Sequence, residues 1–206
     1  KADNYETIIT SFDVTLVEGD IYLVIGTSSK NASENGGVYL LKENRSYRWE
    51  DMRMGSFDVV SVAFSPNYVL DDQVVAIATS ANNTFISTTI DGERWNMQVD
   101  DLEITGFRPN SAVIAFPSDY DSDYRSGNYV QYIGFNAGGS GDGGLFKLIA
   151  SRSSGGTYRE KLHFGTVYGD ELDVVSVAVT GNDKDACIMV GTRSLPHVFY
   201  SSDGGD

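Results

Sequence analysis

The chain has 206 residues, of which 41% are hydrophobic and 12% aromatic, and its net charge is −14. That length is ample for a hydrophobic core. The charge excludes a sequence-independent grip on nucleic acid, which needs clustered Lys and Arg, and binding to an anionic membrane surface. No stretch approaches eighteen consecutive apolar residues, so no membrane span is expected.

Short strands separated by polar turns are expected from the start of the chain. The first four strands are predicted at residues 5–17, 20–27, 38–42 and 47–52, with a long polar loop at 28–37. No segment of ten or more residues keeps a 3.6-residue apolar period, which predicts almost no helix.

The next stretch, residues 59–97, shows the strand pattern most clearly. Val60, Val62 and Phe64 alternate with small or polar residues, the period-2 pattern of a half-buried strand. A continuous apolar run at 74–79 and a third strand at 85–88 follow. A tight turn at 89–95 then ends on a large aromatic residue. The stretch therefore predicts three strands and the start of a fourth.

This stretch recurs along the chain at intervals of about fifty residues, the length of one propeller blade. The letters VVSVA at 59–63 return at 174–178, and Ile77-Ala78-Thr79 returns as Ile25-Gly26-Thr27 and Val190-Gly191-Thr192. Blade units are expected at 5–52, 53–104, 105–164 and 165–206, within one region covering 1–206. The prediction is an all-β propeller of four-stranded antiparallel blades, about four of them. The expected shared core is Val60, Val62, Val75, Ile77, Val113, Val175 and Val177.

The fourth unit stops inside a turn, before a fourth strand. We therefore expect these residues to be part of a larger propeller. The alternative is a closed ring of four blades in which the N-terminal residues supply the missing outer strand.

Two turns resemble the Asp-box, the Ser/Thr-x-Asp-x-Gly-x-Thr-Trp pattern of sialidase-like (BNR repeat) propellers. One contains Thr89, Asp91, Gly92 and Trp95, and is one residue short; the other contains Ser202, Asp203, Gly204 and Gly205. An Asp in such a turn can accept backbone N–H groups, Gly takes the positive φ, and Trp packs beneath. The resemblance implies a structural role away from any active site, and Trp49 and Trp95 are expected at equivalent places.

The same resemblance raises glycoside hydrolysis as an alternative function. Sialidases hold the substrate carboxylate with three arginines, beside a Tyr-Glu pair and an acid Asp. Phe107-Arg108-Pro109 resembles the family's arginine motif but lacks its Ile and follows an Asp-box instead of preceding the first. No catalytic residues can be assigned, so a non-enzymatic member of the family is expected, and a sialidase-type hydrolase or glycan-binding propeller remains the alternative.

One acidic loop has a spacing typical of metal ligands. Asp119, Asp121 and Asp123 alternate, as in the first half of an EF-hand loop, and can converge on calcium. Tyr124 and Val130 stand where that loop has Gly and Glu. A solvated acidic turn is therefore the other interpretation, and no other cofactor is expected.

Three sequons, at Asn31, Asn44 and Asn82, fall in expected turns and are candidate glycosylation sites. Together with the acidity, they favour an extracellular or cell-surface location. The single Cys187 is expected to be buried, and His163 and His197 to be structural or solvent-facing. We expect the protein to act as a structural or interaction module, for example in a surface layer. It would bind protein partners, copies of itself or glycans.

Overall fold

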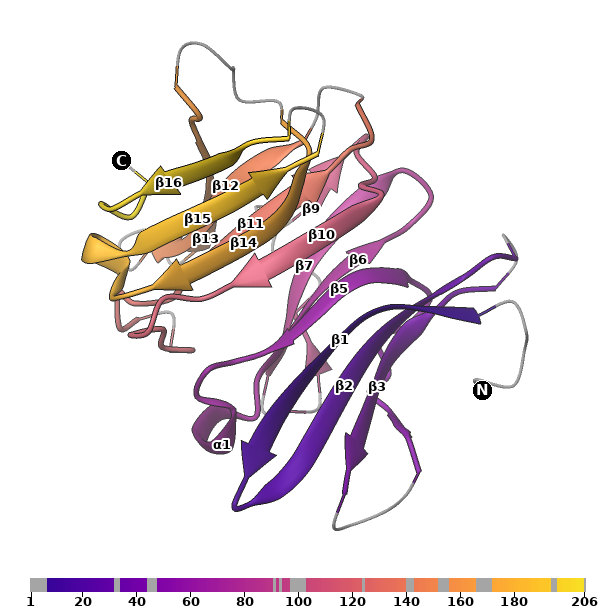
Figure 1. Cartoon of the computed structure of the whole chain (residues 1–206). Coiled ribbons are helices and arrows are strands. Elements are labelled where there is room, and N and C mark those ends of the chain that lie inside the picture. Colours follow the sequence, from indigo (N-terminus) through magenta and orange to yellow (C-terminus); the bar gives the residue numbers. More distant parts are fainter. Residues whose placement is uncertain are drawn as a thin grey trace. The chain divides into compact units, whose positions relative to one another are not determined.

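A computed structural model describes residues 7–31, 34–43, 48–90, 92, 94–96, 103–123, 125–139, 143–151, 156–165, 172–193 and 196–205. Strands dominate these ranges (Figure 1). Their helical segments are α1 (Tyr68–Asp71) and the 3-10 turn η2 (Asp183–Asp185), of four and three residues. The prediction of almost no helix is confirmed.

The first sheet follows the order of the chain. Its strands are β1 (Thr7–Val17), β2 (Asp20–Ser29), β3 (Gly37–Lys42) and β4 (Glu50–Asp51), each antiparallel to the next. Glu18 and Gly19 join β1 to β2 with positive φ angles of 54° and 95°. A two-residue hairpin turn requires that conformation, because it matches the twist of the strands.

The second sheet repeats this meander with a divided outer strand. It contains β5 (Asp58–Phe64), β6 (Val74–Thr79), β7 (Asn83–Ile90) and β8 (Arg94–Trp95). The short β9 (Glu103–Thr105) also pairs with β7, along its first half, while β8 pairs with its last two residues.

The remaining strands form two further meanders. The third sheet contains β10 (Ser111–Ala115), β11 (Val130–Asn136), β12 (Gly144–Ser151) and β13 (Gly156–Leu162). The fourth contains β14 (Val174–Thr180), β15 (Cys187–Thr192) and β16 (Val198–Ser201). These four antiparallel sheets are the blades of a β-propeller, as the sequence predicts, and we number them blades 1 to 4. Within the described residues blade 4 has three strands. Residues 1–6, at the N-terminus that the alternative invokes for the outer strand, lie outside them.

The blades group into two compact units, and each is described by itself. The first holds blades 1 and 2, and the second holds blades 3 and 4. In each unit the two blades pack face to face. We call the face that a blade turns toward the next blade its forward face, and the opposite side its backward face.

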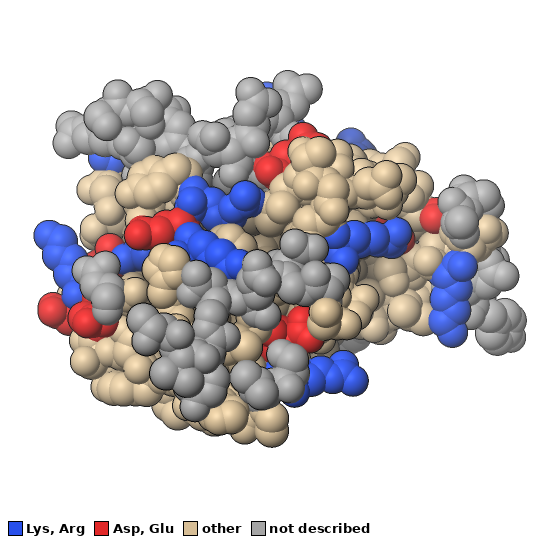
Figure 2. Space-filling model, turned by 90° about the horizontal axis from the view of Figure 1, so that it is seen from above, with Lys and Arg blue, Asp and Glu red and all other residues tan. Residues whose placement is uncertain are grey.

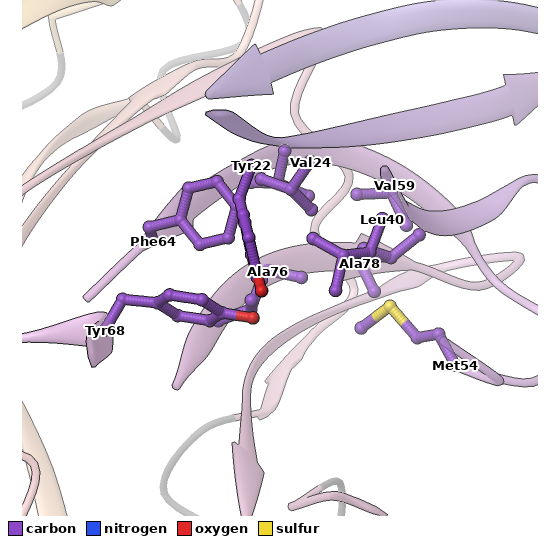
Figure 3. Close-up of a cluster of buried hydrophobic side chains, with 12 residues drawn as sticks. Tyr22, Val24, Leu40, Met54, Val59, Phe64, Tyr68, Ala76 and Ala78 are labelled. Carbon is purple, nitrogen blue, oxygen red and sulfur yellow. The ribbon is translucent and has the colours of Figure 1, made fainter. Parts of the chain in front are cut away.

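The core of the first unit lies between the forward face of blade 1 and the backward face of blade 2 (Figure 3). Val24 and Leu40 come from blade 1, and Val59, Phe64 and Ala76 come from blade 2; all are buried. The second unit is built in the same way, with Tyr132 and Leu145 of blade 3 against Val174, Ile188 and Val190 of blade 4.

The expected core residues are only partly buried. Val62, Val75 and Ile77 are buried, Val60, Val113 and Val177 are half-buried, and Val175 is exposed. The prediction for Val175 is wrong because a bulge interrupts the alternation: Val174 pairs with Thr192 and Ser176 with Gly191, which leaves Val175 outside the ladder. The same irregularity lies at Val60.

Candidate interaction surfaces

Strand β1 turns its polar side chains inward and its apolar side chains outward. On the inward side, the Ser11 hydroxyl accepts the N–H of Val62 and the Asp13 carboxylate accepts the N–H of Phe64, each at 2.8 Å. These bonds satisfy backbone donors on the free edge of β5, which would otherwise be costly to bury. The polar half of β1 is therefore used in the contact between blades 1 and 2.

The outward side of β1 forms part of the backward face of blade 1. Phe12 is 69% exposed and Leu16 is 63% exposed, with Val14 exposed between them. Phe12 pairs with Ile25 and Leu16 with Ile21, so the apolar row continues onto β2. Exposed apolar side chains in a contiguous row mark an interaction surface more often than scattered ones do.

Blade 4 exposes an apolar surface on its forward face. Met189, Val198 and Tyr200 lie there, with Val198 69% exposed and Tyr200 65% exposed. Cys187, on the same side of β15, accepts the Tyr200 hydroxyl at 3.4 Å and is half-buried, so the prediction that it is buried is wrong.

The strand registers show which positions correspond. Gly26 pairs with Ser11 on one side and Val38 on the other, and Gly191 pairs with Ser176 and Val198 in the same way. Val24 pairs with Leu40 as Met189 pairs with Tyr200. The exposed forward face of blade 4 is therefore the counterpart of the forward face of blade 1, whose residues Val24, Val38 and Leu40 are buried against blade 2.

Charged side chains do not define a surface of this kind. On the face shown in Figure 2, the described Lys and Arg side chains are spread among acidic and uncharged ones. No helix in the described part of the chain is long and apolar enough to cross a membrane.

The acidic loop is held by hydrogen bonds from the protein. Asp119 accepts the N–H of Asp183 at 2.9 Å, and Asp121 accepts the N–H of Asp123 at 2.9 Å. Asp123 pairs with the Arg125 guanidinium at 2.9 Å, and hydrogen bonds from Arg125 lower the pKa of this carboxyl. Among the described residues, no three such side chains are grouped to hold a metal ion. The calcium site stays a prediction.

The turn after β16 is organised through a hydroxyl group. The Ser201 hydroxyl donates to the Asp203 carboxylate at 2.6 Å, and the Ser201 Oγ in turn accepts the N–H of Gly205 at 3.0 Å. Gly204 and Gly205 have positive φ, and Ser202 is exposed. In the other turn, Asp91 lies outside the described residues. Gly92 has positive φ, and Thr89 accepts the N–H of Val74.

The remaining candidates lie on surfaces or at strand ends. Arg108 and Asn82 are exposed, Asn31 is half-buried, and Asn44 lies outside the described residues. The two histidines are His163, just after β13, and His197, which stacks on Phe199. The glycosylation sites stay predictions.

Comparisons add no family to these observations. No protein-family model matches the chain, and no curated protein matches it in sequence. What the fold and surfaces define is thus a β-propeller whose first and fourth blades expose apolar faces.

Proposed function

We propose that the protein is a structural and interaction module that assembles through its first and fourth blades. In this assembly, the forward face of blade 4 of one copy packs on the backward face of blade 1 of another. The observation that carries the proposal is the exposure of both faces, since the blade pairs within each unit bury the corresponding faces against each other.

The contact of a forward face with a backward face would then occur both within one copy and between copies. Within a unit, forward-on-backward contact buries Val24, Val38 and Leu40. Between copies it would bury Met189, Val198 and Tyr200 against Phe12, Val14 and Leu16. Burying a fully exposed apolar side chain contributes about 1.5–3 kcal/mol. These six side chains are half to two-thirds exposed, so roughly half of that value from each offsets part of the entropy lost on association.

Such a contact joins two different surfaces of the same chain. A head-to-tail contact of this kind produces a ring if the rotation closes and a filament if it does not. Both products are structural assemblies. The acidity and the sequons at Asn31, Asn44 and Asn82 support an extracellular or cell-surface setting. The Asp-box resemblance supports membership of that propeller family, and the lack of an assignable catalytic set in the sequence supports a non-enzymatic member.

Sedimentation velocity over a range of protein concentrations tests the proposal. We expect the wild type to associate as concentration rises, and the Phe12→Ser/Leu16→Ser variant to stay monomeric at an unchanged Tm, because both side chains are exposed. Leu70→Ser is the matched control, because Leu70 is 87% exposed on α1 and belongs to neither apolar face. A wild type that remains monomeric at high concentration would contradict the proposal.

A further inference from the structure

The contact between blades 1 and 2 is completed by a tryptophan from an outer strand. Trp95 lies in β8, where it pairs with Thr89 of β7. Its indole N–H donates to the carbonyl oxygen of Met52 at 2.8 Å, and its ring packs against the core between the two blades. The outer strand of blade 2 therefore places one aromatic side chain against blade 1.

The second unit has counterparts of the residues around Trp95. In the second unit, Leu162 lies opposite Leu145. In the first unit, the N–H of Met52 donates to the carbonyl oxygen of Val38, so Met52 lies opposite Val38. Leu145 and Val38 correspond because each pairs with the central glycine of its blade, Gly134 or Gly26. Leu162 is therefore the counterpart of Met52, and Ser201, directly before the second Asp-box turn, is the counterpart of Thr89.

At this place the second unit has a pocket of about 380 Å³. Its lining includes both counterparts, Leu162 and Ser201, together with the aromatic side chains Phe164 and Phe199, whose ring centroids are 4.8 Å apart. Leu145, Ile188 and Val190 are buried and belong to the core between blades 3 and 4. The pocket is thus continuous with an established contact between blades.

One edge of β16 borders this pocket. β16 pairs with β15, and no strand in the described part of the chain pairs with its other edge. In blades 1, 2 and 3 the corresponding edge is covered by β4, β8 and β13. The outer edge of a β-sheet can pair with an added extended peptide through main-chain hydrogen bonds.

We propose that β16 and this pocket form a receptor for an extended peptide strand that carries a tryptophan. The strand adds antiparallel to β16, and the indole enters the pocket between Leu162 and Phe199, donating its N–H to the carbonyl oxygen of Leu162 as Trp95 does to Met52. Backbone hydrogen bonds provide the alignment, and the indole provides the specificity. A tryptophan buries about 150–250 Å² of surface, which makes it the dominant contact.

The chain's own β8 sequence supplies the probe. The peptide Gly-Glu-Arg-Trp-Asn-Met, identical to residues 92–97, is titrated into the protein while amide NMR shifts are recorded. We expect shifts at Leu162, Phe164, Ser201 and Gly205. A peptide with Ala in place of Trp should bind at least about tenfold more weakly, the loss typical of a truncated anchor residue.

Two protein variants locate the binding site. Phe199→Asp places a charge in the pocket and should abolish the shifts. Val198→Asp changes the neighbouring residue on the opposite side of the same strand and should leave them intact, although it should disrupt association through the forward face. If Phe199→Asp does not fold, the comparison of Trp and Ala peptides decides.

The proposal is overturned if the two peptides bind equally, or if the shifts fall outside the pocket. Since a free hexapeptide loses much entropy on ordering, a titration without shifts is followed by tethering. The hexapeptide is fused after Asp206, which raises its effective concentration. A Tm equal for the Trp and Ala fusions then also overturns the proposal.

Discussion

Asp58 and Asp173 occupy the same position in two copies of one six-residue sequence, DVVSVA. Each carboxylate accepts hydrogen bonds from backbone N–H groups of the preceding blade. Asp58 accepts the N–H groups of Ser29 and Gly36 at 2.9 and 3.0 Å. Asp173 accepts the N–H of Ala137 at 2.8 Å. Ser29 is the last residue of β2, and Ala137 directly follows β11. The repeated sequence thus carries a repeated contact between successive blades.

We expect Asp173→Ala to lower the free energy of unfolding by about 1–3 kcal/mol, because it removes the acceptor of a part-buried N–H donor. Asp173→Asn should lose less, because the amide oxygen can still accept. Urea unfolding measures both. Asp185→Ala, at an exposed position, is the control, and a loss at Asp173 no larger than at Asp185 would show that the contact is not stabilising.

Glycine lies where the second strand of a blade approaches the first strand of the next blade. A Cβ at Gly26 would lie 2.7 Å from Cγ1 of Val59, and one at Gly134 would overlap Val174. We expect Gly26→Ala and Gly134→Ala each to destabilise the protein by about 1–3 kcal/mol through overpacking. Thermal unfolding measures this loss.

Gly37→Ala is the matched control, because its added Cβ would meet the Tyr39 ring at an ordinary 3.6 Å. Shortening the neighbour in Gly26→Ala/Val59→Ala should remove the clash, so the double variant should cost less than the sum of the single ones. Simple additivity would argue against the close approach.

Calcium binding at Asp119, Asp121 and Asp123 predicts a higher Tm in millimolar calcium than in chelator, because a cation that binds only the folded loop stabilises it by mass action. Asp121→Asn should remove the response. Arg125→Gln should enlarge it, since Arg125 now competes for Asp123. Identical melting curves with calcium and with chelator would leave the loop as a solvated acidic turn.

The strands of this protein could be predicted from sequence because their period-2 patterns and polar turns are local properties. The pairing between them could not. The repeat of Ile25-Gly26-Thr27 as Ile77-Ala78-Thr79 aligns Ala78 with Gly26. In the structure Ile77, which lies between Ser61 and Ile86, occupies the position of Gly26 in the sheet. The letters Ile-x-Thr are thus matched one residue out of register, because a short apolar pattern does not specify which residues pair across strands.

The candidate surfaces were harder to predict for the same reason. Alternation of Phe12, Val14 and Leu16 indicates that one side of β1 is apolar, but not that this side is exposed. Ser11 and Asp13 look like solvent-facing residues, and their use against β5 depends on a contact between blades distant in sequence. The pocket beside β16 could be recognised only once the registers of both units were known.

The central claim is that the forward face of blade 4 packs on the backward face of blade 1 of another copy. Its most direct test is sedimentation velocity on two blocked variants, alone and mixed. Phe12→Asp blocks the backward face and Tyr200→Asp blocks the forward face, each at an exposed position. We expect either variant alone to be monomeric and their equimolar mixture to form a one-to-one dimer through the two intact faces. A mixture that stays monomeric, or a single variant that dimerises by itself, would contradict the claim.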